Sequence, residues 1–416
     1  MAASNSGLQV DEIWVDKGPG LDRLMFMAAG KAVEIWHQFA HAPDRVGEVH
    51  RLRIDQIFTS QNRASGRLDD GTPVSVRLNR RNRLATGQII DINITAAPRE
   101  EKPWQAVVGA RLAGAFMVLL PESEGVQASQ ALAENEASAL KAKISAALPA
   151  GFGLILRRRA RGVSSQRLHD ELAQLLNSWH AQASDEIGLG RRHDGGDLLT
   201  RASFHAPGAE FRSAIAADQF DDLYEAAMLR ACQTPVGLPS GGQIWIEHTH
   251  AVTAIDLDSK SGSIEALIDE APAELAHQIR LRGLAGLLAI DVPRLAPARA
   301  RAFTEALADA FADDPRYPEI LGRSRGGLLE CRVAHGRMPL SDSTADDGMM
   351  AALAGLREIA RRPTLARPYL EISPLMAAWL DGPGAAAMAA LDREVTLVVS
   401  SNVSRANILE DGWGDG

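Results

Sequence analysis

Two apolar segments that each end on an acidic residue, with a helical pattern between them, constrain the fold of this chain most. The segment TAIDLD carries Asp256 and Asp258, and the segment GLLAID ends on Asp291. Between them, SIEALIDEAPAELAHQIRLRGL has its apolar residues at helical spacing. A strand, a helix and a strand of this length form a crossover unit, in which the two strands are parallel. The sequence therefore predicts that both strands deliver their aspartates to one edge of a sheet.

These acidic residues indicate a cation site. Ligands bind at the carboxyl edge of such sheets, and facing carboxylates repel each other unless a cation lies between them. Magnesium is the expected ion, because it favours a few carboxylate oxygens together with water and phosphate. A single strand-end aspartate is more often a cap of the next turn, but two in matching positions favour a metal site. His248 and His250 are a weaker metal hypothesis, since no third ligand accompanies them at a suitable spacing.

The composition sets limits on the class of protein. A chain of 416 residues with 46% hydrophobic and 23% charged residues is globular and too long for one ordinary core. The net charge of -9 argues against nonspecific binding to polyanions. Two cysteines, Cys232 and Cys331, cannot form a four-thiolate zinc site. No segment reaches the length of a membrane span and the N-terminus lacks signal-peptide features, so we expect a cytoplasmic protein.

Positive charge is concentrated in two clusters, RLNRRNR at 77–83 and RRRARG at 157–162. Arginine binds phosphate through a planar fork of donors, although a solvated basic face is the alternative for both clusters. The second cluster follows the strand pattern GFGLIL, so we expect Arg158 and Arg159 to project beside Arg157 on alternating faces.

Short strand patterns precede these clusters. Residues 10–40 are expected to form two short strands joined by the turn GPGLDR, and about five short strands between 48 and 108 predict a small barrel. Helical patterns follow in EASALKAKISAAL and in SSQRLHDELAQLLNSWHAQA.

Several of these strings resemble the catalytic half of the ribonuclease E/G family. LPSGGQIWIEHTHAVTAIDLDS, QIRLRGLAGLLAID and SRGGLLECR occur in the family's order, and LAGAFMVLLPESEGVQAS and GFGLILRRRARG look like the start of its 5'-sensing domain. The resemblance covers roughly residues 110–335 and is weak on both sides of this range.

The resemblance implies an α+β and α/β multidomain fold, in which a ribonuclease-H-like domain is split by an OB-type barrel and a 5'-sensor domain. A deoxyribonuclease-I-like catalytic domain and a small C-terminal domain follow. The expected ranges are 1–47 with 185–237 for the split domain, 48–108 for a shortened barrel, 109–184 for the sensor, 238–340 for the catalytic domain and 341–416 for the last domain.

The resemblance also assigns roles at the acidic sheet edge. Asp256 and Asp291 fall on the magnesium-binding aspartates of the family. Asp258 stands where the family typically has asparagine, and the extra charge either tightens metal binding or disturbs the attacking water. Arg325 of SRGGLLE falls on an arginine near the active site, where it is placed to bind phosphate.

Further positions are implied to bind RNA. Arg157 falls on the 5'-monophosphate-binding arginine, and Arg158 replaces the usual threonine beside it. The aromatic base-stacking positions of the barrel hold nonaromatic residues near Arg67 and Val76, which weakens the grip on single strands. The remaining RNA-binding positions are Lys102, which matches a family lysine, and the arginines of the first cluster, Arg77, Arg80 and Arg81.

The implied function is that of a magnesium-dependent endoribonuclease that cleaves single-stranded RNA, senses a 5'-monophosphate, and acts in RNA processing or decay, including that of rRNA and mRNA. A metal-generated hydroxide would leave 5'-phosphate and 3'-hydroxyl ends. The family's Cys-Pro-x-Cys zinc motif is missing, so any homo-oligomer is expected to form without a zinc link, as in a short, ribonuclease G-like form. The alternatives are a noncatalytic RNA-binding paralogue and a phosphodiesterase for a small nucleotide.

Overall fold

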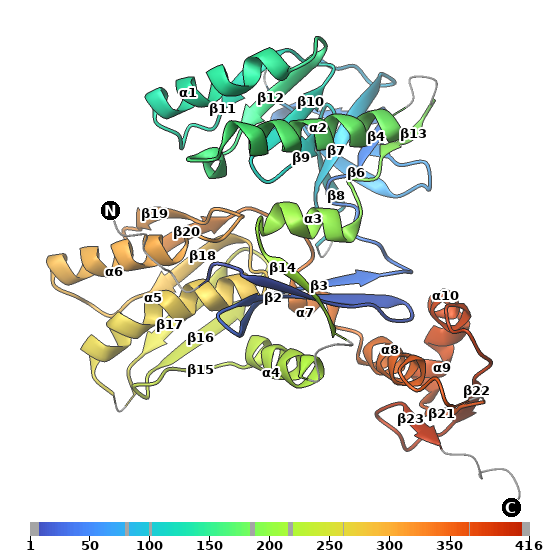
Figure 1. Cartoon of the computed structure of the whole chain (residues 1–416). Helices are drawn as coiled ribbons and strands as arrows, with labels where there is room; N and C mark the ends of the chain where they lie inside the picture. The colour runs from blue at the N-terminus through green and yellow to red at the C-terminus, as the bar shows by residue number, and fades with distance from the viewer. Residues whose placement is uncertain are drawn as a thin grey trace, which may run out of the picture. The chain divides into compact units, whose positions relative to one another are not determined.

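The computed structural model describes residues 8–79, 83–99, 102–183, 188–214, 219–260, 262–365 and 367–409. The chain is a mixed α/β, multidomain protein, as predicted, and it forms two compact units (Figure 1). One unit is Arg45–Ala209 with His335–Met338, and the other contains the remaining residues. In the described residues, no helix is long and apolar enough to cross a membrane.

A closed barrel begins the first of these units. Its strands are β4 (Val49–Phe58), β5 (Arg63–Arg67), β6 (Pro73–Arg77), β8 (Trp104–Val108) and β7 (Ile89–Ala96), paired in this order, and β7 pairs back with β4. Alternate residues of each strand point inward and form an apolar core. The small barrel predicted for 48–108 is therefore confirmed, and its closure is consistent with an OB-type domain.

A four-stranded sheet with two helices follows the barrel. The sheet has the order β11 (Gly125–Ala128), β12 (Phe152–Leu156), β10 (Met117–Pro121) and β9 (Leu112–Ala113). The helices α1 (Glu134–Ile144) and α2 (Ser165–Gln182) pack on it through an apolar core that includes Leu140, Leu168 and Leu172. The chain then returns to the barrel, because β13 (Gly190–His193) pairs with β4, and α3 (Leu198–His205) ends this unit.

The other unit starts with the sheet β14 (Glu210–Ser213), β1 (Glu12–Asp16), β2 (Leu21–Ala28) and β3 (Lys31–Phe39), in this order. The prediction of two strands in residues 10–40 was wrong, since a tight turn divides the longer one into β2 and β3. Ala29 and Gly30 form this turn with positive φ angles of 48° and 77°. Helix α4 (Phe220–Cys232) packs on β3.

A six-stranded mixed sheet forms the centre of this unit. Its order is β15 (Val236–Gly237), β16 (Gln243–His248), β17 (Thr253–Asp258), β18 (Gly286–Asp291), β20 (Leu329–Val333) and β19 (Glu319–Arg323). Helices α5 (Ile264–Leu281) and α6 (Pro297–Ala310) lie together on the same side of it (Figure 1). Helix α5 is buried along most of its length because it packs on β16 and β17 and also on β3.

The last part of the chain is a small helical region with a three-stranded sheet. It comprises α7 (Leu340–Ser343), α8 (Asp347–Ala360), α9 (Pro374–Asp381) and α10 (Ala385–Ala389), and the strands β22 (Thr396–Val399), β21 (Tyr369–Ile372) and β23 (Asn407–Leu409) in sheet order. Buried Asp16 of β1 forms ion pairs with Arg357 and Arg361, which fastens the end of α8 to the first sheet. The division of the chain into domains at the predicted boundaries stays a prediction.

Candidate functional site

The crossover between β17 and β18 brings the predicted acidic residues together. The two strands are parallel and directly hydrogen-bonded, and Asp256 is paired in register with Asp291. Helix α5 makes the connection between them. The two aspartates therefore lie on adjacent strands at the carboxyl edge of the sheet, which is the arrangement that the sequence pattern predicts.

The alternation of side chains along β17 decides which residues face the open side of the sheet. Thr253, Ile255 and Leu257 are buried, whereas Asp256 and Asp258 are exposed. On β18, Ile290 is buried and Asp291 is exposed. The apolar residues pack on the helix-covered face, so all three carboxylates lie on the opposite, solvent-accessible face.

The surroundings of Asp256 raise the pKa of its carboxyl. Partial burial raises the pKa of Asp256 above its usual value, and the negative charges of Asp291 and Asp258 raise it further. A cation placed between the carboxylates would remove this repulsion. The electrostatics therefore favour binding of a divalent ion at this edge.

Asp258 also has a structural role. Its Oδ1 accepts a hydrogen bond of 2.8 Å from the backbone N–H of Lys260, which has a positive φ of 47°. This is the turn-capping role that is common for a strand-end aspartate. An asparagine oxygen would accept the same hydrogen bond, so the turn itself does not require the extra charge.

Arg325 lies near the same end of β18. It belongs to the hairpin between β19 and β20, closed by a hydrogen bond of 2.9 Å from Ser324 N–H to the Leu328 carbonyl. Leu329, just after this hairpin, pairs with Ile290, the residue before Asp291. Arg325 is exposed and has no ion-pair partner among the described residues. Its guanidinium is therefore available to a phosphate beside the acidic edge.

The donor set fits magnesium better than a transition metal. Among the described residues, no group of three histidine, cysteine or acidic side chains converges closely enough to hold a metal ion. Two carboxylates are sufficient for magnesium, which takes its other ligands from water and substrate phosphate. The histidine hypothesis gains no support, because His248 Nδ1 lies 2.9 Å from Thr253 Oγ1 next to the turn of the β16–β17 hairpin.

The arginines at 157–159 form a second candidate site. Arg157 Nη1 donates a hydrogen bond of 2.6 Å to the Gly114 carbonyl. The expectation that the next two side chains alternate along a strand was wrong, because Arg158–Ala160 form a turn of 3-10 helix. The strand ends at Leu156 instead, and Ala160 turns inward into the core. Arg157 and Arg158 are both half-buried.

Buried Glu171 of α2 fixes the loop beside Arg157, and sequence patterns did not reveal it. Its carboxylate accepts hydrogen bonds from the N–H groups of Ala115, Phe116 and Met117 at 3.1, 2.8 and 3.0 Å. A Cβ on Gly114 would meet Glu171 Oε1 at 2.4 Å, so only glycine allows this approach. Desolvation raises the pKa of Glu171, while these hydrogen bonds and the charge of Arg157 act in the opposite direction.

The barrel presents part of the predicted RNA-binding set on its outer face. Arg77 at the end of β6 and Lys102 before β8 are exposed, whereas Arg80 and Arg81 lie outside the described residues. Arg63 lies opposite Arg77 on β5 and donates hydrogen bonds to Ser75 and Gln105, so it extends this polar face. Val76 is fully buried and cannot stack on a base.

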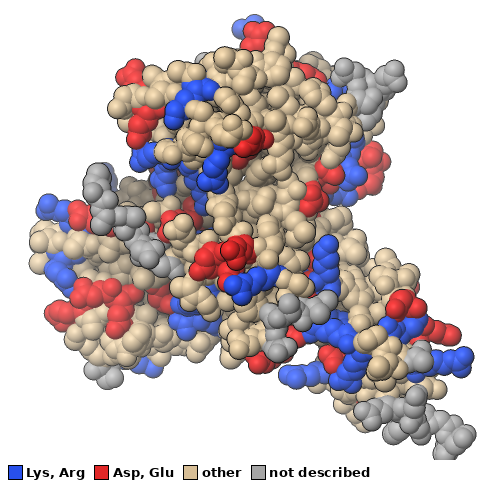
Figure 2. Space-filling view, in the orientation of Figure 1, with Lys and Arg blue, Asp and Glu red and all other residues tan. Residues whose placement is uncertain are grey.

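Figure 2 shows acidic and basic side chains interspersed on the visible surface, without a continuous basic area. This distribution agrees with the net charge of -9. Arg157 and Arg325 are the arginines that lie beside the two candidate sites.

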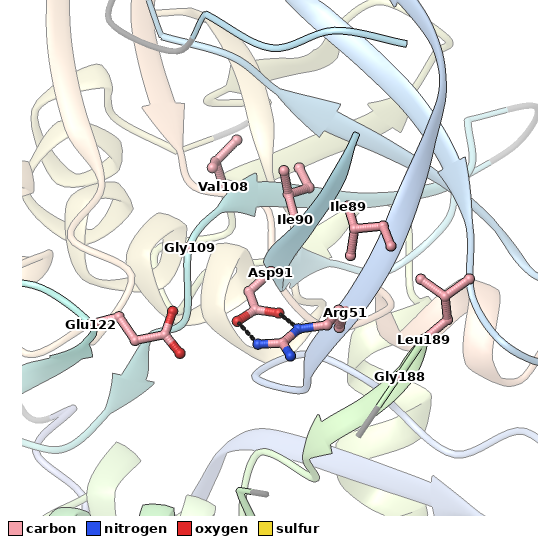
Figure 3. A pocket seen from close by; sticks show the side chains of 9 residues that line it. All are labelled: Arg51, Ile89, Ile90, Asp91, Val108, Gly109, Glu122, Gly188 and Leu189. Atoms are coloured by element: carbon pink, nitrogen blue, oxygen red, sulfur yellow. Dashed lines mark hydrogen bonds and ion pairs between the residues drawn. The ribbon is translucent and has the colours of Figure 1, made fainter. Parts of the chain in front are cut away.

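A cavity of about 680 Å³ lies at the edge of the barrel (Figure 3). Ile89 and Leu189 line it beside an ion pair in which Arg51 Nε donates to Asp91 Oδ1 at 2.8 Å. Glu122, also in the lining, accepts a hydrogen bond of 2.7 Å from Arg192. The ionisable groups of the cavity are thus held in ion pairs, which leaves it no evident catalytic group.

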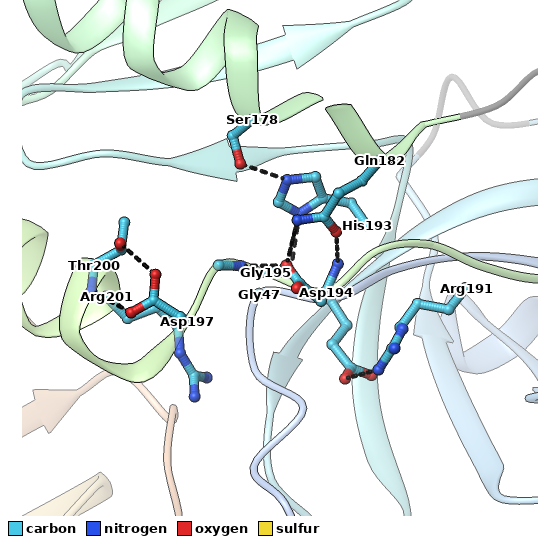
Figure 4. Close-up of polar contacts among 12 residues, drawn as sticks. Gly47, Ser178, Gln182, Arg191, His193, Asp194, Gly195, Asp197, Thr200 and Arg201 are labelled. Atoms are coloured by element: carbon cyan, nitrogen blue, oxygen red, sulfur yellow. Dashed lines mark hydrogen bonds and ion pairs between the residues drawn. The ribbon is translucent and has the colours of Figure 1, made fainter. Parts of the chain in front are cut away.

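A serine, a histidine and an aspartate also lie near each other beside β13 (Figure 4). His193 Nε2 is 2.9 Å from Ser178 Oγ, and His193 Nδ1 accepts a hydrogen bond of 2.9 Å from Gly195 N–H. The proton of this buried imidazole is therefore on Nε2, where it is donated to the serine. A histidine that donates to the hydroxyl cannot activate it as a nucleophile, so these contacts are structural.

The family comparison covers both candidate sites. The model of the Ribonuclease E/G family matches residues 111–192 and 217–332, which include the acidic strand ends and the arginines at 157 and 158. Over these ranges the chain matches the ribonuclease E/G family. The barrel strands, in contrast, lie outside the matched ranges of the family model.

Two curated relatives in this family are named Ribonuclease E. The chain is 31% identical over 299 residues to that of Haemophilus influenzae, an alignment that covers 61% of this chain and 32% of the relative. It is 30% identical over 293 residues to that of Escherichia coli, which covers 59% of this chain and 28% of the relative.

A third relative is the Ribonuclease G of Escherichia coli. It is 25% identical over 289 residues, which are 59% of each chain. The chain thus spans about a third or less of these two ribonuclease E relatives and 59% of this ribonuclease G relative.

Proposed function

We propose that this protein is a magnesium-dependent endoribonuclease that cleaves single-stranded RNA in RNA processing or decay. The observation that carries the proposal is the register of β17 and β18, which places Asp256 beside Asp291 on an open sheet face. The names of its relatives, Ribonuclease E and Ribonuclease G, support RNA as the substrate.

Each residue of the sheet edge has a separate role in the proposed reaction. Asp256 and Asp291 would hold the magnesium ion, which when bound supplies a Lewis acid and an activated water. Arg325 binds a non-bridging oxygen of the scissile phosphate and offsets the negative charge that grows in the transition state. Asp258 keeps the turn after β17 in place through its hydrogen bond to Lys260 N–H, and its charge adds to the attraction for the cation.

Recognition of the 5' end is proposed for the second site. Arg157 is held against the Gly114 carbonyl, and Glu171 fixes the loop that carries this carbonyl. A terminal monophosphate has two charges and compact oxygens that fit an arginine fork, whereas a 5'-hydroxyl offers neither. Arg158, in the following 3-10 turn, keeps the site attractive to anions.

The outer face of the barrel is proposed to bind the phosphate backbone of the single strand. Arg63, Arg77 and Lys102 would contact phosphates without reading the sequence. Each such contact releases counterions, so binding should weaken as the salt concentration rises.

The test is a cleavage assay on a 5'-labelled single-stranded RNA in magnesium and in EDTA, with the duplex of the same sequence alongside. Magnesium-dependent cuts within the single strand support the proposal. Tight RNA binding without any cleavage would instead identify a noncatalytic RNA-binding paralogue. Hydrolysis of dinucleotides only would identify a phosphodiesterase for small nucleotides, and would contradict the proposed substrate.

A further inference from the structure

An exposed tryptophan stands in the same row of the sheet as the acidic pair. Trp245 of β16 is paired in register with Asp256 of β17, which is in turn paired with Asp291 of β18. Residues that are paired in this way project from the same face of a sheet, on strands about 4.8 Å apart. The indole therefore emerges one strand away from the first aspartate and two strands away from the second.

The position is unusual for so large an apolar side chain. The neighbours of Trp245 on its own strand, Ile244 and Ile246, point into the core, and β16 has the burial pattern of a strand with one solvent face. Trp245 nevertheless exposes 37% of its surface. Among the described residues, no other aromatic ring is stacked on it. More than a third of the surface of this residue thus remains open to a ligand.

Small side chains keep the ring accessible. The next row of the open face carries Glu247 on β16, exposed Ala254 on β17 and half-buried Ala289 on β18, and these residues are paired in register. Alanine side chains rise little above the sheet, so they leave room beside the indole and the carboxylates for a flat group. A nucleobase attached to a phosphate at the acidic pair has this shape.

The barrel does not offer such a surface. The sequence of residues 48–108 contains two aromatic residues, Phe58 and Trp104. Both are only half-exposed, and Trp104 packs against the barrel core. The polar face formed by Arg63, Arg77 and Lys102 can bind phosphates, but it lacks an exposed ring on which a base could stack.

We propose that Trp245 is a substrate-binding residue on which one base of single-stranded RNA stacks, next to the phosphate that a magnesium ion at Asp256 and Asp291 would bind. This inference rests on the proposed endoribonuclease function and adds to it the group that holds the reacting nucleotide in register. Stacking on an aromatic ring tolerates any base and requires an unpaired one. Trp245 would therefore favour single strands over duplexes without imposing a sequence.

RNA binding by the 416-residue chain is the first test. The affinity for a fluorescently labelled single-stranded RNA is measured in EDTA, where nothing is cut. We expect Trp245→Ala to weaken binding about 5- to 150-fold, the range for loss of one base–aromatic stack. Trp245→Phe should restore most of the affinity, whereas Trp245→Leu, which is apolar without a ring, should not. The matched control is Leu321→Ala, an exposed apolar residue on β19 of the same sheet, which should bind like the wild type.

A substrate series locates the base. RNAs that lack a single base at successive positions around the cleaved bond are compared in wild type and in Trp245→Ala. Loss of the base at one of these positions should lower the affinity and the kcat/KM of the wild type. It should not lower those of Trp245→Ala, because removing either the base or the indole removes the same stack. If Trp245 had only a structural role, the losses of affinity caused by removing the base and by Trp245→Ala would add.

Three results would overturn the proposal. The first is an unchanged RNA affinity of Trp245→Ala, and the second is an equal RNA affinity of the leucine and phenylalanine variants. The third is a change of oligomeric state in Trp245→Ala with intact RNA affinity, which would identify the ring as a contact between copies of the chain. If the wild type neither binds nor cuts RNA, the proposed function itself fails. If it does both regardless of Trp245, only this inference fails.

Discussion

Asp256→Asn should stabilise the metal-free protein at neutral pH. Partial burial raises the pKa of this carboxyl, and its two like-charged neighbours, Asp291 and Asp258, raise it further. Exposed like-charge pairs cost about 0.2–1 kcal/mol each. Because Asp256 is exposed and screened by solvent, we expect the lower part of the summed range, about 0.4–1 kcal/mol. For a unit of this size, that corresponds to a rise in Tm of about 1–4 °C.

The dependence on pH follows from the raised pKa. The folded state binds the Asp256 proton more tightly than the unfolded state, so this carboxyl stabilises the fold at low pH, and the contribution is lost as the pH rises through the folded pKa. The advantage of Asp256→Asn should therefore be complete at pH 7.5 and should fade as the pH falls towards the ordinary value of 3.8.

Thermal unfolding followed by circular dichroism in EDTA checks this prediction, with repeats in magnesium and at low pH. Magnesium should raise the Tm of the wild type more than that of the variant. The control is Asp55→Asn, an exposed strand aspartate of the barrel, which should shift the Tm little. An unchanged or lower Tm of Asp256→Asn in EDTA at pH 7.5 would refute the idea of repulsion at the sheet edge.

Three further outcomes are expected. Arg157→Ala should erase the faster cleavage of 5'-monophosphorylated RNA over 5'-hydroxyl or triphosphorylated RNA while sparing basal cleavage; equal rates for all three ends in the wild type would contradict 5' sensing. Glu171→Ala should cost at least about 3 kcal/mol in unfolding free energy, since it leaves three buried N–H groups without an acceptor, and a loss below about 1 kcal/mol in denaturant titration would be inconsistent with these contacts. Metal analysis should find no stoichiometric structural zinc, because Cys232 and Cys331 are free and cannot form a paired site; zinc lost together with oligomerisation on chelation would overturn this.

The sheet edge could be predicted from the sequence because local rules determine it. A strand, a helix and a strand in succession leave one common topology, and each strand carries its aspartate at its end. The pairing of Asp256 with Asp291 follows from these facts. The closed barrel was also predictable, since its short strands alternate apolar and polar residues between turn signals.

Other features depend on contacts that no local pattern encodes. Glu171 meets the loop at Gly114 only after α2 has packed on its sheet, so its role could not be found from spacing. The turn at Ala29 lacks the asparagine or aspartate that usually marks a positive φ, so the break between β2 and β3 was missed. The placement of Trp245 beside Asp256 depends on the register of the β16–β17 hairpin, which the turn sequence alone did not specify.

The most direct test of the acidic pair is cleavage of a 5'-labelled single-stranded RNA by the wild type, Asp256→Asn and Asp291→Asn, with and without magnesium. Each substitution removes a charge at an exposed strand end while keeping the volume of the side chain, so the fold should persist, as far-UV circular dichroism would verify. We predict magnesium-dependent cleavage by the wild type and a loss of at least about 100-fold in each variant, with RNA binding retained. Near wild-type, magnesium-dependent cleavage by either variant would contradict the two-aspartate site.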